Sequence, residues 1–312
     1  MLAEDLELIP GRWIGSKHPC FVIAEIGQNH QGNIYTAKQL IETAKKCGAD
    51  CVKFQKAYNG EKFNKAALAR PYLSKHSWGR TYGEHKKYLE FSDEDFRELR
   101  NYAEKVIKIP FTASAMDSKS VSFLESMKVP FIKIGSGDVK NIPLIRQAAA
   151  TNIPLVISTG MSDMEGVQEI YATVKQLHKK FILLHFISEV SERLNPTNRH
   201  ITLDKNLKGN DHHCSLEPKE FKQMVEEIRT IEAALGQRQK RIQDSELPCI
   251  AKLGKTIVAA TNLSKGTVLT PECVKIKVAE PKGLDPKEYE GRRLNRDVVE
   301  DESITTQCVQ TL

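Results

Sequence analysis

Residues 21–55, FVIAEIGQNHQGNIYTAKQLIETAKKCGADCVKFQ, contain an apolar strand, an amphipathic helix and a second apolar strand. Gly48 follows the helical part as a typical helix stop. Strands that are apolar on both faces and are joined by helices are typical of parallel sheets. The apolar residues of the helical part recur on one face: Ile34, Ala37, Leu40, Ile41 and Ala44. The stretch therefore predicts a strand–helix–strand unit of an α/β protein.

The same alternation of strand and helix continues along most of the chain. Such a series, with polar residues at the strand ends, favours a (β/α)8 TIM-type barrel, and an open doubly wound sheet is the structural alternative. No Gly-x-Gly-x-x-Gly follows the first strand, which counts against a dinucleotide-binding fold. The expected strands are residues 21–26, 50–55, 109–114, 131–135, 154–158, 181–188 and 199–203.

The last two expected strands are too close together for a complete barrel. Residues 189–198 separate them, whereas each parallel crossover needs about a dozen residues or more. An eight-stranded barrel would require a helix, a strand and another helix in this interval. We therefore expect an incomplete barrel of about seven strands.

The chain divides into three parts by composition. Residues 1–240 carry the strand–helix alternation, and residues 241–251 form a polar linker. Residues 252–312 contain short β-type runs among glycines and prolines, which predicts a small, mostly-β second domain.

A long excursion over residues 56–92 interrupts the alternation after the second strand. Loops of this length are usually functional or disordered, and its many aromatic residues argue against disorder. Ser92 and Asp95 predict a capping box for the next helix. That helix is expected to bury Phe96, Leu99, Ala103 and Val106.

Composition excludes several classes of function. The chain has 46 basic and 40 acidic residues, and no run of Lys or Arg is long enough to indicate nucleic-acid binding. No apolar run approaches the ~20 residues needed to span a bilayer. The seven cysteines form no CxxC pair, so free thiols in a reducing compartment are expected. These features favour a cytoplasmic protein without membrane or nucleic-acid partners.

Polar residues end the predicted strands, where the active site of a β/α-barrel lies. Two lysines and several serines in this position predict a cradle for a phosphate or carboxylate group. The alternatives are lysines that are simply solvated, or a lysine that forms a Schiff base. The candidate residues are Lys53, Gln55, Ser114, Lys133, Ser136, Ser158 and Ser188.

Three further residues have two interpretations each. Glu25 interrupts an apolar strand and is either a general acid/base or a salt-bridge partner of Lys53. His200 is either a metal ligand or a core histidine, and spacing alone favours the core. Asp211, in a polar loop, is either catalytic or a turn residue.

Several long motifs resemble the sialic acid synthase family and occur in the same order. They are Ile23-Ala-Glu-Ile-Gly-Gln-Asn-His-Gln-Gly32, Lys53-Phe-Gln55, Lys133-Ile-Gly-Ser-Gly-Asp138, Ser158-Thr-Gly-Met161 and Arg199-His-Ile-Thr-Leu-Asp-Lys205. Arg70-Pro-Tyr-Leu-Ser-Lys-His-Ser-Trp-Gly79 is similar to the animal members in particular. The last part resembles their antifreeze-like (SAF) domain through Lys252-Leu-Gly-Lys-Thr and Ala279-Glu-Pro-Lys-Gly283.

The resemblance implies condensation of phosphoenolpyruvate with N-acetylmannosamine 6-phosphate, aided by a divalent metal, Mg²⁺ or Mn²⁺. It implies that Glu25 is the acid/base, that Gln55 and Asp211 contact the sugar, and that His200 binds the metal. It also implies a domain-swapped homodimer in which the SAF domain of one subunit covers the site of the other; whether Lys282 reaches a neighbouring site is left open. The residues expected to hold phosphoenolpyruvate are Lys53, Ser114, Lys133, Ser136, Ser158 and Ser188.

The chain departs from the family pattern between the sixth and last strands. The family's Gly-Tyr-Ser-x-His segment, which supplies a second metal histidine and a serine, has no counterpart, and Asn198 stands where the family has a carboxylate. We therefore predict an internal deletion and an incomplete metal site. The alternative function is an inactive variant that binds phosphoenolpyruvate or pairs with intact subunits.

Overall fold

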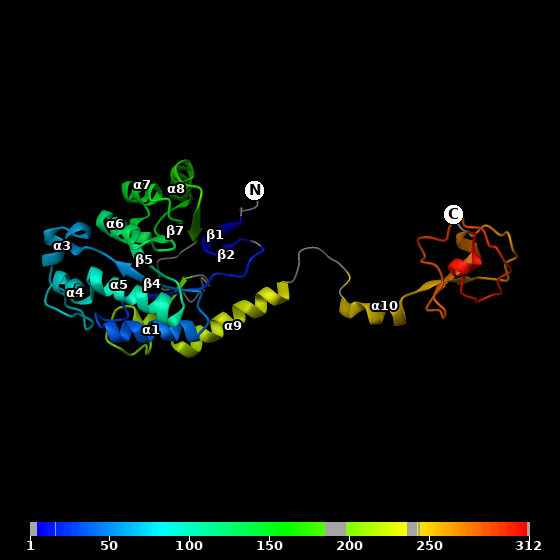
Figure 1. The fold of residues 1–312 in the computed structure, drawn as a ribbon, viewed down its shortest axis with the longest axis horizontal. Coiled ribbons are helices and arrows are strands. Elements are labelled where there is room, and N and C mark those ends of the chain that lie inside the picture. Colours follow the sequence, from blue (N-terminus) through cyan, green and yellow to red (C-terminus); the bar gives the residue numbers. More distant parts are fainter. Residues whose placement is uncertain (1–4, 16, 185–197, 236–241, 243, 311–312) are drawn as a thin grey trace. The chain divides into compact units, whose positions relative to one another are not determined.

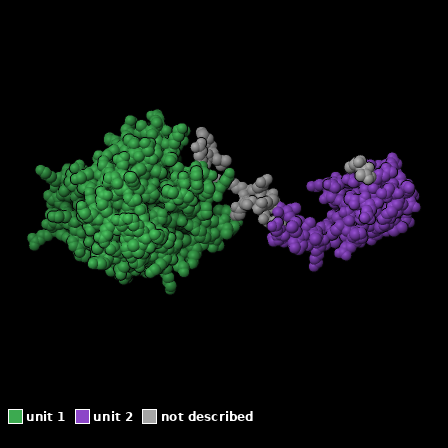
Figure 2. Space-filling model, viewed as in Figure 1, with its two compact units in different colours: residues 1–236 green, residues 237–312 purple. Residues whose placement is uncertain are grey.

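The computed structural model describes residues 5–15, 17–184, 198–235, 242 and 244–310, in two compact units. Unit 1 spans Met1–Gly236 and unit 2 spans Gln237–Leu312 (Figures 1 and 2). Each unit has its own hydrophobic core. The chain therefore folds around two separate centres.

The central element of unit 1 is a seven-stranded parallel sheet in the order β8-β7-β6-β5-β4-β3-β9. Among the described residues, β8 and β9 are the two edges and no strand joins them. The prediction of a TIM-type barrel with about seven strands is thus confirmed. The strands are β3 (Ile23–Gly27), β4 (Cys51–Lys56), β5 (Phe111–Ala115), β6 (Ile132–Ile134), β7 (Leu155–Ser158), β8 (Phe181–Leu184) and β9 (Asn198–His200).

Strand limits differ from the predicted ones by a few residues. The last strand ends at His200 rather than at residue 203, because its pairing with β3 stops where Glu25 meets His200. Residues 185–188 of the predicted sixth strand lie outside the described residues.

Helices cover the outer face of the sheet (Figure 1). Their apolar stripes pack on outward-facing strand residues such as Ala24, Val52 and Phe54 in one large core. Alternate residues, such as Ile23 and Cys51, point to the inside. The helices of this layer are α1 (Ile34–Lys46), α5 (Asp93–Asn101), α6 (Ser118–Ser126), α7 (Ile142–Ala150), α8 (Met164–Leu177) and α9 (Pro218–Leu235).

A hairpin that the sequence did not predict closes the amino-terminal end of the sheet. Strands β1 (Leu6–Ile9) and β2 (Arg12–Ile14) pair antiparallel. Leu8 is buried in a small cluster with inward residues of the sheet, among them Phe131 and Val156. Water is therefore excluded from this end, and the opposite end is left for ligands.

The helix after the excursion begins as predicted and then changes its pitch. Ser92 and Asp95 form the predicted capping box. Phe96, Leu99 and Ala103 are buried as expected, but Val106 is 63% exposed, so that prediction is wrong. Tyr102–Ile107 is π-helical, and the wider turn rotates Val106 off the apolar face.

The excursion is ordered, as its aromatic residues indicated. It contains α2 (Asn59–Lys62), α3 (Lys65–Ala69) and α4 (Tyr82–Leu89). Its aromatic rings pack on one another, with Trp78 stacked on Tyr88 at 4.5 Å between ring centroids. The segment therefore forms a structured wall beyond the end of β4.

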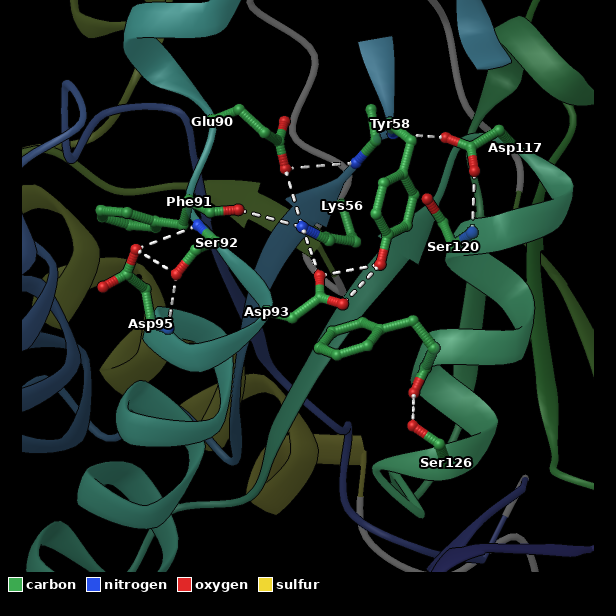
Figure 3. Close-up of polar contacts among 12 residues, drawn as sticks. Lys56, Tyr58, Glu90, Phe91, Ser92, Asp93, Asp95, Asp117, Ser120 and Ser126 are labelled. Carbon is green, nitrogen blue, oxygen red and sulfur yellow. Dashed lines mark hydrogen bonds and ion pairs between the residues drawn. The ribbon is translucent and has the colours of Figure 1, made fainter. Parts of the chain in front are cut away.

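Lys56, at the start of the excursion, contacts residues at and just after its end (Figure 3). Its buried ammonium donates to the Phe91 carbonyl at 2.9 Å and lies 3.1 Å from Asp93 and 3.5 Å from Glu90. Burial raises the pKa of Glu90 to about 7, although Lys56 opposes this. Two carboxylates thus compete for one lysine inside the protein.

Glu90→Gln is expected to flatten the fall in stability between pH 5 and 8. A carboxyl whose folded pKa lies above its unfolded pKa contributes stability below the unfolded value, and this contribution is lost as pH rises through about 7. From pH 5 to pH 8, the free energy of unfolding of the variant should rise by ~1–3 kcal/mol relative to that of the parent. Urea unfolding of both proteins at pH 5 and at pH 8 measures this difference. Glu94→Gln, an exposed change on α5, is the control, and an equal gain there would contradict the assignment.

Unit 2 is small and rich in turns, with one antiparallel pair, β10 (Thr256–Ala259) and β11 (Val274–Lys277). Ile257, Leu294 and Ile304 are central to its core. Helix α10 (Leu247–Leu253) lies partly within the predicted linker, so that part of the stretch is helical; its role as a linker stays a prediction. Lys282 donates to the Gly254 carbonyl at 2.6 Å within this unit.

Membrane-spanning segments are not found in the described part of the chain. None of the helices there combines the length and the apolar character that crossing a bilayer requires.

Candidate active site

A cavity of about 620 Å³ lies at the carboxyl ends of the sheet strands. It gathers side chains from β3, β4, β5, β6, β7 and β9, so six strands contribute to one site. Among the residues that line it are eight of the predicted site residues: Glu25, Lys53, Gln55, Ser114, Lys133, Ser136, Ser158 and His200.

Lys53 is the central cation of this cavity. Its ammonium contacts the carboxylate of Glu25 through Oε2 and donates to Ser114 Oγ at 2.7 Å. Lys53 is 2% exposed and Glu25 is 3% exposed. The parallel register places Glu25 beside Lys53, which explains the contact. The predicted salt bridge is present, and Lys53 is not a solvated strand-end lysine.

Lys133 is the second buried cation. It donates to Ser158 Oγ at 2.6 Å and to the Ile134 carbonyl at 2.8 Å. Burial and, to a smaller extent, the charge of Lys53 lower the pKa of Lys133 to about 7, although Glu25 opposes both effects. The neighbours of Lys133 neutralise little of its charge, so an entering anion would stabilise the protonated form.

Four buried polar atoms on the cavity wall have no hydrogen-bond partner among the described residues. They are Glu25 Oε1, Ser136 Oγ, Asn198 Oδ1 and His200 Nδ1. Buried polar groups in native proteins are nearly always paired, so orphaned atoms that line a cavity indicate a polar ligand. His200 lines this cavity, and its role as a metal ligand stays a prediction.

Gly27 makes room for the side chains that approach from β9 and β4. Its φ is +56°, and a Cβ there would lie 3.0 Å from His200 Cε1 and 3.4 Å from Gln55 Nε2. Gly27→Ala is therefore expected to destabilise unit 1 by ~1–3 kcal/mol and to displace His200. Urea unfolding gives the first effect, and a shifted His200 ring resonance in NMR gives the second.

Gly137→Ala is the matched control for this prediction. Gly137 lines the same cavity, but nothing lies within 4 Å of a Cβ built there. A loss of stability as large as that of Gly27→Ala would contradict the explanation from backbone conformation and crowding.

A smaller cavity of about 180 Å³ lies next to the first and shares Gln55 with it. Asp211 is on its wall, so this predicted site residue lines the neighbouring cavity and not the main one. Ser215 donates to the main-chain carbonyl of Asp211 at 2.6 Å, while no hydrogen bond is described for the carboxylate of Asp211. The other residues around this cavity are Gln28, Gln31, Lys86, Leu89 and Asn210.

Sequence reasoning missed the contribution of the excursion to the site. Lys62 lines the main cavity and Lys86 lines the smaller one. Neither lysine follows a predicted strand or belongs to an apolar pattern. The signal near them was the segment 70–79, which is similar to the animal members of the family. Ser188, predicted to hold the anion, lies outside the described residues.

The described residues do not form a complete site for a divalent metal. No three His, Cys, Asp or Glu side chains gather as a metal-binding group within the ranges that the structure describes. His200 and Glu25, paired across β9 and β3, supply one imidazole and one carboxylate. Mg²⁺ requires near-octahedral oxygen ligation, which this pair alone does not provide.

Family comparisons cover both units of the chain. Residues 40–198 and 195–240 match the NeuB family, and residues 254–310 match the SAF domain. The alignment of this chain with a relative from Mus musculus runs over 350 positions, whereas this chain has 312 residues. That excess and the divided family match favour the predicted internal deletion, which stays a prediction.

Individual relatives agree with the family match. The chain is 44% identical to the N-acetylneuraminate-9-phosphate synthase of Mus musculus, over 98% of this chain and 97% of the relative. It is 41% identical to the enzyme of the same name from Drosophila melanogaster, over 97% and 98%. These similarities confirm the resemblance to sialic acid synthases.

Solved structures share the fold. The N-acetylneuraminic acid (sialic acid) synthetase of Leptospira borgpetersenii, in complex with citrate, superposes with a TM-score of 0.68 at 25% identity, over 80% of this chain and 96% of that one. The spore coat protein SpsE of Bacillus subtilis gives 0.62 at 24% identity, over 99% and 100%, and supports the fold alone. With a family match over most of the sheet and relatives aligned along nearly their whole length, the chain belongs to the NeuB family and carries a carboxyl-terminal SAF domain.

Proposed function

We propose that this chain is an N-acetylneuraminate-9-phosphate synthase, which condenses phosphoenolpyruvate with N-acetylmannosamine 6-phosphate and releases phosphate. The observation that carries the proposal is the pair of buried lysines, Lys53 and Lys133, each bonded to a serine beside the carboxylate of Glu25. The names of the relatives that align along the whole chain support the same activity.

Phosphoenolpyruvate has two anionic groups, and the cavity has two buried ammonium groups. Lys53 and Lys133 neutralise the carboxylate and the phosphate, and the hydroxyls of Ser114 and Ser158 donate to the same oxygens. Ser136, whose Oγ has no partner among the described residues, supplies a further donor. Ser188 is proposed for the same role from its sequence position.

The reaction joins C3 of phosphoenolpyruvate to the aldehyde carbon of the open-chain sugar. Water then adds at C2 and phosphate leaves, which balances the reaction without an oxidant. Glu25 lines the cavity and contacts Lys53 through Oε2, while its Oε1 has no hydrogen-bond partner among the described residues. We assign to this oxygen the transfer of protons between substrate and water. Gln55 and Asp211 contact the sugar.

The metal expected for this family, Mg²⁺ or Mn²⁺, would bind at His200. Because the described residues offer an incomplete ligand set, no step is assigned to it. This supports a second candidate function, in which the chain binds phosphoenolpyruvate with little or no catalysis, or pairs with intact subunits.

The resemblance to the family also supports a proposal for the assembly and the location of the protein. The protein acts as a domain-swapped homodimer in the cytoplasm, with the SAF domain of one subunit covering the partner's site. The seven cysteines, which form no CxxC pair, agree with a reducing compartment.

Two measurements on the purified chain separate the candidates. Calorimetric titration with phosphoenolpyruvate reports the anion site, and phosphate release with both substrates and Mn²⁺ reports catalysis. Product formation at roughly 1 s⁻¹ or faster supports the synthase. Binding without product supports the second candidate. Absence of phosphoenolpyruvate binding contradicts the synthase and the binding protein, and co-purification with a full-length synthase then tests whether the chain pairs with intact subunits.

A further inference from the structure

Two lysines of the excursion, Lys62 and Lys86, differ in their partners from Lys53 and Lys56. Lys53 and Lys56 each contact a carboxylate. Lys62 instead donates to the thioether of Met116 at 2.8 Å, and Lys86 donates to the side-chain carbonyl of Gln28 at 2.9 Å. No ion pair is described for either ammonium in the part of the chain that the structure covers. Each charge is therefore held by a neutral acceptor.

Both lysines are half-buried, which makes their charge costly without an anion. Burial lowers the pKa of each, and Lys62 lowers the pKa of Lys86 further. Nearby carboxylates raise the pKa of each lysine: Asp138, Glu90 and Asp117 for Lys62, and Asp211 and Glu90 for Lys86. No ion-pair contact is described between these carboxylates and either lysine. The charge of Lys62 thus disfavours the protonated form of Lys86, and a dianion in contact with both ammonium groups would stabilise both.

Their position relative to the two cavities is specific. Lys62 lines the larger cavity, Lys86 lines the smaller one, and Gln55 borders both. Helices α2 and α4, which carry the lysines, pack against each other in the wall beyond β4. A ligand that extends from the strand ends past Gln55 would meet both cations.

We propose that Lys62 and Lys86 together bind the phosphate group of the acceptor sugar and so select the phosphorylated acceptor. This inference rests on the proposed function. The aldehyde end of the acceptor must meet phosphoenolpyruvate beside Lys53 and Lys133. The phosphate is at the other end of the sugar chain and therefore lies toward the excursion. Amide groups and Asp211 in the smaller cavity suit the hydroxyls between the two ends.

The test compares binding of N-acetylmannosamine 6-phosphate and N-acetylmannosamine by calorimetry, in the presence of phosphoenolpyruvate and with divalent metal removed by a chelator so that no product forms. The double variant Lys62→Met/Lys86→Met is expected to lose about 100-fold or more in affinity for the sugar phosphate. Its affinities for the unphosphorylated sugar and for phosphoenolpyruvate should change by less than about threefold. Lys62→Arg/Lys86→Arg should retain the preference for the phosphorylated sugar.

Lys87→Met is the matched control, since Lys87 is exposed on the same helix as Lys86. Thermal unfolding of each variant shows whether it is folded. Equal losses for both sugars, or no loss, overturn the inference and leave the proposed function standing. A parent chain that binds phosphoenolpyruvate but prefers neither sugar also overturns it, whereas a chain that binds neither substrate overturns both.

Discussion

Lys53→Met is expected to lower the free energy of unfolding of unit 1 by about 3–5 kcal/mol at neutral pH, because it leaves Glu25 buried without its cation. Both side chains are almost fully buried and in direct contact, so water cannot take the place of the ammonium. Urea unfolding at pH about 7 measures the loss. The same variant should no longer bind phosphoenolpyruvate measurably, since one of its two cations is gone.

The control for Lys53→Met is the double variant Glu25→Gln/Lys53→Met. Removing both charges avoids the isolated carboxylate, so most of the stability should return, while phosphoenolpyruvate binding should stay lost. A double variant as unstable as Lys53→Met would show that packing around the lysine stem, rather than the orphaned charge, causes the loss.

Binding of phosphoenolpyruvate is expected to take up a proton at Lys133. Its pKa in the free protein is lowered to about 7, and an anion beside the ammonium raises it. Between pH 7 and 9, affinity should therefore fall by up to tenfold per pH unit. Calorimetry at pH about 8 in two buffers with different ionisation enthalpies should show uptake of up to about one proton per ligand.

Lys133→Gln should bind at least 100-fold more weakly and without this uptake, because a charge-assisted contact is lost. Lys119→Gln, outside the main cavity, should keep both the affinity and the proton uptake. Heat changes that do not depend on the buffer in the parent chain would contradict the assignment. A lysine with a pKa near 7 is also able to form a Schiff base, and borohydride trapping with a keto acid would expose that alternative chemistry.

The free-energy change that accompanies a lowered lysine pKa has a definite sign. The folded protein binds a proton at Lys133 less tightly than the unfolded chain does. Its contribution to stability is therefore present at pH above the unfolded pKa and is lost as pH falls through about 7. A bound anion should offset this loss of stability. Between pH 7 and 9, phosphoenolpyruvate should therefore stabilise the protein most near pH 7.

Much of the fold was predictable because it depends on local periodicity. Apolar strands separated by amphipathic helices specified a parallel sheet, and the short interval before Arg199 limited it to seven strands. The amino-terminal hairpin and the π-helical turn were not predictable, since short strands and a change of pitch leave no periodic signal. Val106 shows the consequence, because its helical spacing predicted a buried side chain that the wider turn exposes.

By itself, the sequence determined which side chains stand at the strand ends, because residues two apart on a strand point to the same face. That rule placed Lys53 and Gln55 on one face of β4. Lys133 and Ser136 reach the same end of the sheet because they lie at and just after the end of β6. The tertiary structure alone decided which partners these groups have. Contacts such as that of Lys133 with Ser158, and the approach of Lys62 and Lys86 to the two cavities, join residues far apart in the chain. Their existence depends on strand register and on the packing of the excursion, neither of which local pattern specifies.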